Sequence, residues 1–131
     1  MNEFMTDIRN INVLVLAYLG DSVYEIYVRE KLIKDGFSNV NALQKESIKY
    51  VSAKAQAKFL DNLIKNDFFD SDELEVIKRG RNYKTGRHPK NCDVITYKYA
   101  TALETLIGYW YLTDNKYRIE KLMEFILNSN F

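Results

Sequence analysis

Hydrophobic and small residues recur at steps of three and four along residues 13–34, which predicts one long helix with an apolar side. The residues on this stripe are Val13, Leu16, Ala17, Gly20, Val23 and Tyr24. Gly36 follows the stretch and is a suitable residue to end a helix. We therefore expect a long first helix whose apolar side is buried.

The rest of the chain continues this helical pattern. A second helix is predicted from Asn39, and Ser52 is a suitable N-cap for a third that carries a stripe of Ala53, Gln56, Ala57, Leu60 and Ile64. Ser71 and the acids after it open a fourth helix. Asp93 or Asn91 caps a fifth, 94–112, which is apolar on most faces and should lie at the centre. An amphipathic helix over 115–130 ends the chain. No segment favours a β-strand, so the sequence predicts an all-α fold.

Two of these helices combine a glycine with an acid. Gly20 precedes Asp21 in the first helix, and a glycine inside a helix costs about 1 kcal/mol relative to alanine. In the fifth helix, Gly108 lies four residues after Glu104 and Ala100 four residues before it. If the two helices packed against each other at these small residues, Asp21 and Glu104 would lie in one acidic site. Asp93 cannot join them, because it lies about 16 Å away along the helix.

Other interpretations of these acids stay open on the sequence alone. Asp21 is equally suited to capping a helix that begins after a Leu-Gly turn, with Glu25 paired to Arg29 four residues on. Two carboxylates at positions 21 and 25 repel unless a cation lies near them, which favours a metal. Glu104 could also be a buried acid paired with a base, although its own helix offers no base within one turn.

Composition limits the chemistry. The chain has 131 residues, which fits one domain, and no apolar run approaches the roughly 20 residues that span a bilayer. With no signal peptide at its start, we expect a cytoplasmic protein that does not contact a membrane. Cys92 and His88 are each alone, which excludes an intrachain disulfide, a cysteine-based zinc site and most catalytic triads. Any metal must therefore be held by oxygen.

Positive charge gathers in one segment although the net charge is only +1. Six basic residues precede the first acid, Asp93; they are Lys78, Arg79, Arg81, Lys84, Arg87 and Lys90. A solvated basic loop is the ordinary interpretation of such a run. Because the segment also contains glycine and asparagine, it is suited to contact the phosphates of a nucleic acid.

Several motifs together resemble one known family. The segments LAYLGDSVYE and ALETLIGYWYL are similar to the two acidic motifs of the ribonuclease III catalytic domain. YVSAKAQA and KRGRNYKTGRHPKN resemble its short Mini-III subfamily. The resemblance covers nearly the whole chain and implies a single catalytic domain over residues 1–131, with six to seven helices. It further implies a homodimer that uses Mg²⁺ to cleave double-stranded RNA, leaving 5′-phosphates and maturing the ends of precursor 23S ribosomal RNA. Whether a ribosomal protein presents the substrate stays open.

The resemblance assigns roles to particular residues. Asp21 and Glu104 match the family's metal-binding, catalytic acids, whereas Ala17 and Thr101 stand where the larger enzymes carry two more acids. We expect no counterpart of the family's separate RNA-binding domain. RNA binding is therefore expected from the residues Arg79, Arg81, Lys84, Arg87 and Lys90, although Arg79 and Arg81 could instead brace the loop.

The apolar side of the first helix also exceeds what a small domain readily buries, so we expect Leu19, Val23 and Tyr27 to contribute to a symmetric dimer interface. Two rival interpretations stay open. The first is a catalytically silent RNA-binding or ribosome-assembly module, which Ala17 and Thr101 keep possible. The second is a helical dimerisation domain that binds no nucleic acid.

Overall fold

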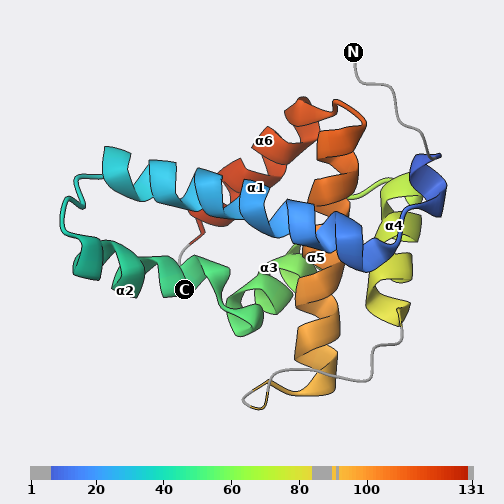
Figure 1. Ribbon diagram of the computed structural model, residues 1–131, viewed down its shortest axis with the longest axis horizontal. Helices are drawn as coiled ribbons and strands as arrows, with labels where there is room; N and C mark the ends of the chain where they lie inside the picture. Colours follow the sequence, from blue (N-terminus) through green and yellow to red (C-terminus); the bar gives the residue numbers. More distant parts are fainter. Residues whose placement is uncertain (1–6, 84–89, 91, 130–131) are drawn as a thin grey trace.

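The computed structural model describes residues 7–83, 90 and 92–129, which form a short 3-10 turn, Ile8–Asn10, and six α-helices (Figure 1). The helices are α1 (Val13–Lys34), α2 (Val40–Val51), α3 (Ala53–Lys65), α4 (Ser71–Asn82), α5 (Val94–Leu112) and α6 (Lys116–Leu127). Among the described residues no strand occurs, and the expected all-α fold is confirmed. None of the described helices is long and apolar enough to cross a membrane.

Polar side chains begin most helices where the sequence predicts. Ser52 accepts a hydrogen bond from the backbone N–H of Ala55 at 3.1 Å and so starts α3. Of the two candidates for α5, the cap is Asp93, which accepts from the N–H of Thr96 at 2.8 Å. Helix α4 begins at Ser71, as expected, and the residue before it, Asp70, is the cap. Asp70 exchanges side-chain and backbone hydrogen bonds with Glu73 in a reciprocal capping box.

Helix α5 lies at the centre, as its sequence predicts. It packs against α1, α3 and α4 and contacts α6, and Figure 1 shows α1 running across it. Its buried residues occupy almost every position from Ala100 to Trp110. Because α5 is surrounded, the position of its only acid, Glu104, is determined by the helices that pack on it.

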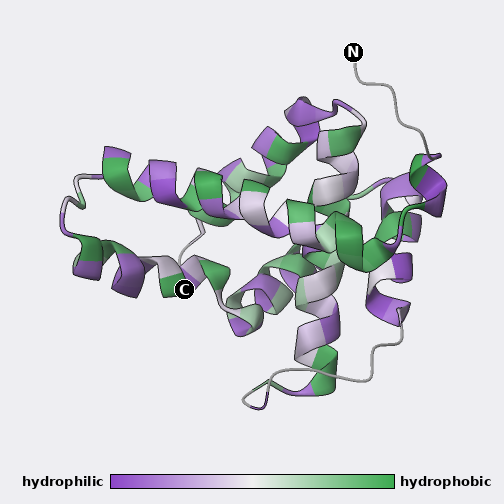
Figure 2. Ribbon diagram, viewed as in Figure 1, coloured by the Kyte–Doolittle hydropathy of each residue, from purple (hydrophilic) through white to green (hydrophobic). Residues whose placement is uncertain are grey.

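Helix α1 is apolar on two sides. The predicted stripe faces the core, and all six of its residues are buried. A second set of large hydrophobic residues lies exposed along the same helix, consisting of Val15, Tyr18, Ile26 and Ile33. Figure 2 shows hydrophobic residues recurring along the whole length of α1. Part of this helix therefore has exposed hydrophobic side chains.

Candidate active site

Helices α1 and α5 cross with their backbones in direct contact. A Cβ atom added to Gly20 would collide with the carbonyl oxygen of Glu104, and one added to Gly108 would collide with that of Leu16. Each glycine thus admits the backbone of the opposite helix, which confirms the close approach predicted from the sequence.

This crossing brings together the two acids that the sequence singles out. Asp21 lies in the interior of α1 and is exposed, so the interpretation of Asp21 as a helix N-cap is wrong. Glu104 lies on α5 and is partly buried, and its carboxyl group is within hydrogen-bonding reach of that of Asp21. Two carboxyl groups from different helices therefore form one acidic site. Asp93 takes no part, since it caps α5.

The surroundings of Glu104 disfavour its ionised form. Burial is the main cause, and the neighbouring Asp21 adds to it, so that the pKa of Glu104 rises from 4.5 to about 9. A hydrogen bond from Gln56 opposes this rise, whereas the charge of Glu25 adds to it. At neutral pH the site therefore holds a proton unless another positive charge replaces it.

This raised pKa predicts how stability depends on pH when no metal is present. The folded protein holds the proton of Glu104 more tightly than the unfolded chain does. The stabilisation from this group is therefore complete below about pH 4.5 and is lost as the pH rises toward 9. We expect urea unfolding in EDTA to show wild-type protein losing more stability between pH 5 and pH 8 than Glu104→Gln. Parallel losses in the two proteins would contradict the assigned environment.

Gln56 is the residue of the site that sequence reasoning missed. The sequence places it in the apolar stripe of α3, and the structure does bury it, with 2% of its surface exposed. Its amide nitrogen donates to Oε2 of Glu104 at 3.4 Å. The available signal was an amide within an otherwise apolar stripe, since a buried amide needs a hydrogen-bonding partner.

Glu25 lies one turn after Asp21 but is engaged by a base of its own helix. Its Oε1 atom accepts from Nε of Arg29 at 3.2 Å, which confirms the pairing proposed from their spacing. Within the residues that the structure describes, no cluster of three or more acids, histidines or cysteines is arranged to hold a metal ion. The acidic site therefore rests on two carboxyl groups.

The positions where the larger enzymes carry further acids are filled by buried residues. Ala17 and Thr101 are each 6% exposed. Neither has a carboxyl group, and both lie in the packed interior. Of these four positions, only those of Asp21 and Glu104 carry a carboxyl group that could bind a metal.

The basic residues of the 78–90 segment have different surroundings. Arg79 donates from Nη2 to the backbone oxygen of Arg9 at 3.2 Å, so it joins α4 to the N-terminal 3-10 turn. Arg81 donates to the side chain of the adjacent Asn82 at 3.2 Å, and Lys90 is exposed. Lys84 and Arg87 lie outside the described residues.

A second basic surface lies at the junction of α2 and α3. Lys49, Lys54 and Lys58 line one cavity of about 610 Å³. Lys49 is paired there with Glu46 at 3.1 Å. This surface is an alternative place for polyanion binding if the 78–90 segment does not provide it.

Comparison with known proteins identifies relatives for nearly the whole chain. A model of the Ribonuclease III domain matches residues 14–115. The chain is 48% identical to the Mini-ribonuclease 3 of Desulfitobacterium hafniense over 85% of its length and 69% of the relative's. It is 42% identical to that of Enterococcus faecalis over 95% of both chains. A crystal structure of a Fusobacterium nucleatum protein superposes with a TM-score of 0.85 at 34% identity, covering 96% of this chain and all of the other.

Proposed function

Because the chain belongs to the ribonuclease III family and resembles its Mini-ribonuclease 3 members throughout, we propose that it is a Mg²⁺-dependent enzyme that hydrolyses double-stranded RNA and leaves 5′-phosphates. Membership of the family makes it an RNA endonuclease. The observation that carries the finer proposal is the placement of Asp21 and Glu104 beside each other where α1 and α5 cross. Both acids belong to the catalytic domain that residues 1–131 would form.

The donor set at the crossing fits a magnesium ion. Mg²⁺ prefers oxygen ligands, keeps several of its waters, and is often held by only one or two carboxylates together with substrate phosphates. Asp21 and Glu104 would hold it, and its charge would offset the burial and the nearby Asp21 that together raise the pKa of Glu104. When bound, the ion supplies electrostatic activation of the scissile phosphodiester and of the attacking water.

The chain's own residues provide position and charge for this reaction. Asp21 is exposed beside the partly buried Glu104, so the acidic site opens to solvent on the Asp21 side, where a phosphate can reach it. The close crossing of α1 and α5 brings together the backbone segments that carry the two carboxyl groups. No side-chain nucleophile is needed, because water attacks the phosphorus atom.

We propose precursor 23S ribosomal RNA in the cytoplasm as the substrate, processed at its paired ends. A-form RNA presents phosphates and 2′-hydroxyls in a wide, shallow minor groove, so recognition should depend on shape and backbone. A ribosomal protein that presents the RNA would be a further partner. The exposed Lys90, together with Lys84 and Arg87, supports phosphate contacts from the 78–90 segment. Arg81 belongs to the same proposal, whereas the contact of Arg79 with Arg9 favours a bracing role.

Removing charge from this segment should change the salt dependence of RNA binding. Each neutralised phosphate releases counterions, so the double variant Arg87→Ala/Lys90→Ala should bind more weakly, with a salt slope shallower by roughly one unit per lost contact. The measurement is the affinity of Asp21→Asn protein for one duplex across a range of KCl, with and without the two changes. Lys34→Ala, at an exposed lysine of α1, is the control. Equal salt slopes with and without the two changes would contradict RNA binding by this segment and would favour binding by Lys49, Lys54 and Lys58.

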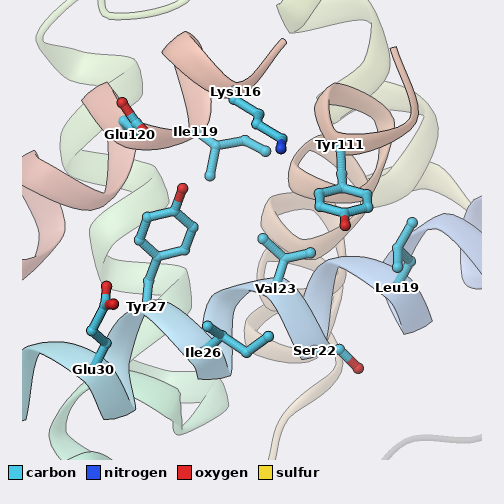
Figure 3. A pocket seen from close by; sticks show the side chains of 10 residues that line it. All are labelled: Leu19, Ser22, Val23, Ile26, Tyr27, Glu30, Tyr111, Lys116, Ile119 and Glu120. Carbon is cyan, nitrogen blue, oxygen red and sulfur yellow. The ribbon is translucent and has the colours of Figure 1, made fainter. Parts of the chain in front are cut away.

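We further propose that two copies associate through the exposed side of α1. Val15, Tyr18 and Ile26 are 56%, 80% and 66% exposed, which is unusual for large hydrophobic side chains on one helix. Ile26 borders a cavity of about 490 Å³ whose wall is apolar and whose rim carries Glu30, Glu120 and Lys116 (Figure 3). Of the residues expected at this interface, Val23 is only 7% exposed but also lines this cavity (Figure 3). Leu19 and Tyr27 are partly exposed in the cavity wall.

A charge on this surface should prevent the association. We expect wild-type protein to sediment as a dimer at micromolar concentration and Ile26→Glu to sediment as a monomer with an unchanged circular-dichroism spectrum, because the glutamate would be desolvated at the interface. Ile48→Glu is the matched control, since Ile48 is 59% exposed on α2, outside this surface. A monomeric wild-type protein would contradict the proposed dimer.

One assay separates the enzyme from a catalytically silent RNA-binding module. Labelled duplex RNA is incubated with pure protein in the presence of Mg²⁺ or of EDTA, and the products are resolved by length and end group. The proposal expects shortened duplexes with 5′-phosphates only in Mg²⁺. RNA that is bound but remains intact in both conditions would support the silent module, which Ala17 and Thr101 keep possible.

A further inference from the structure

Gln56 has a polar side chain in a place that packing alone would fill with a hydrophobic one. It is 2% exposed, and its neighbours on the buried side of α3 are Phe59, Leu60 and Leu63. Burying an amide costs free energy unless its hydrogen bonds are made, whereas a leucine of similar size carries no such cost. The amide is directed at one partner, Oε2 of Glu104. We therefore look for the role of Gln56 in its hydrogen bond to Glu104.

The local structure holds Gln56 firmly against the acidic site. Ser52 caps α3 from one side, and its backbone oxygen accepts from the N–H of Gln56 at 2.9 Å. Tyr24, three residues after Asp21 on α1, donates its hydroxyl to the backbone oxygen of Tyr50 at 2.5 Å. The junction of α2 and α3 is thereby tied to the helix that carries Asp21. Gln56 is thus positioned relative to α1 as well as to α5.

We propose that Gln56 is a positioning residue for the divalent cation, which it serves by holding Oε2 of Glu104 so that the other carboxylate oxygen remains available beside Asp21. The proposal rests on the metal-dependent function proposed above. A neutral amide suits this task better than Lys or Arg, because it donates a hydrogen bond to the ionised carboxylate without cancelling the charge that attracts the ion. With two carboxyl groups in place of four, the orientation of each has a larger effect on metal binding.

The test replaces the amide while keeping its volume. Gln56→Leu and Gln56→Met remove the hydrogen bond, and Gln44→Leu makes the same exchange at an exposed position of α2. Manganese binding is measured by electron paramagnetic resonance, and thermal unfolding is measured in EDTA. RNA cleavage is followed across a range of Mg²⁺ concentrations. We expect Gln56→Leu to bind Mn²⁺ about tenfold more weakly, as is typical when the partner of a metal ligand is lost.

Two further readouts distinguish positioning from a merely structural role. In EDTA the unfolding temperature of Gln56→Leu should equal or exceed that of wild type, because an apolar side chain suits the buried position. Its cleavage rate should fall at limiting Mg²⁺ and recover as Mg²⁺ is raised. Gln44→Leu should behave as wild type in every readout.

Each contrary result has its own meaning. Folded Gln56→Leu and Gln56→Met proteins with manganese affinity within twofold of wild type would overturn the role of Gln56 and leave the proposed enzyme intact. Failure of both variants to fold would make Gln56 a structural residue and would also overturn the proposal. A wild-type protein that binds no Mn²⁺ would overturn the proposed function itself, and the role of Gln56 with it.

Discussion

Replacing Asp21 by Asn, or Glu104 by Gln, is expected to abolish RNA cleavage while leaving the fold and RNA binding largely intact. Each change removes an anionic oxygen ligand but almost no volume. A bound metal ion contributes several kcal/mol to stabilising charge in the transition state, so the loss should be at least about a thousandfold in rate. The measurement is single-turnover cleavage of duplex RNA at saturating enzyme.

Matched substitutions elsewhere show whether the effect belongs to the site. Asp114→Asn keeps the backbone conformation at a position with φ of +58°, which asparagine tolerates, and Glu124→Gln alters an exposed acid of α6. Both should cleave at the wild-type rate. Full activity in Asp21→Asn or Glu104→Gln would refute the acidic site as the catalytic one. Manganese binding should be weakened in these two variants and unchanged in the controls.

The second large effect is expected on stability, from alanine at Gly20 or Gly108. At an ordinary helix position this exchange would stabilise the protein, because alanine has the higher helix propensity. Here the added methyl group would meet a backbone carbonyl of the opposite helix, which cannot rotate away as a side chain can. The helices would have to separate along their whole contact. We expect each variant to lose about 3 kcal/mol or more of the free energy of unfolding.

Urea unfolding monitored by circular dichroism measures this loss, with Ser22→Ala, at an exposed position of α1, as the control. Gly80→Ala provides a graded case, because a Cβ atom there would lie 2.9 Å from the side-chain Oγ1 of Thr105 and 3.0 Å from Cα of Ala102. These distances are longer than those at Gly20 and Gly108, so the loss should be smaller than at either of them. Wild-type stability in Gly20→Ala would show that α1 and α5 can move apart at little cost.

The sequence predicts most of the helical framework because its signals are local. Hydrophobic spacing and capping residues act within one or two turns, and α1 begins and ends at the expected residues Val13 and Lys34. The proximity of Asp21 and Glu104 could also be predicted, because each acid lies near a glycine on its helix. Two helices that each carry such a glycine can pack with their backbones close together. These inferences needed no knowledge of how distant segments pack.

The remaining features depend on contacts between distant segments. Gln56 and Glu104 are 48 positions apart, and Arg79 and Arg9 are 70 apart, so no spacing rule connects them. The second apolar side of α1 illustrates a different difficulty. The periodicity of the buried stripe does not tell whether the other hydrophobic residues of this helix also pack within the chain. Packing decides this, and it leaves Val15, Tyr18 and Ile26 exposed.

The contacts at Gly20 and Gly108 fix how α1 and α5 pack against each other beside the acidic site. Because main chain rests on main chain, no layer of side chains between the helices can repack in small steps. The helices consequently have one register, since sliding either by a residue would drive a side chain into the opposing backbone. The spacing of the two backbone segments that carry Asp21 and Glu104 should then be insensitive to surface substitutions and to modest heating. Activity should disappear together with the fold, rather than decline before it.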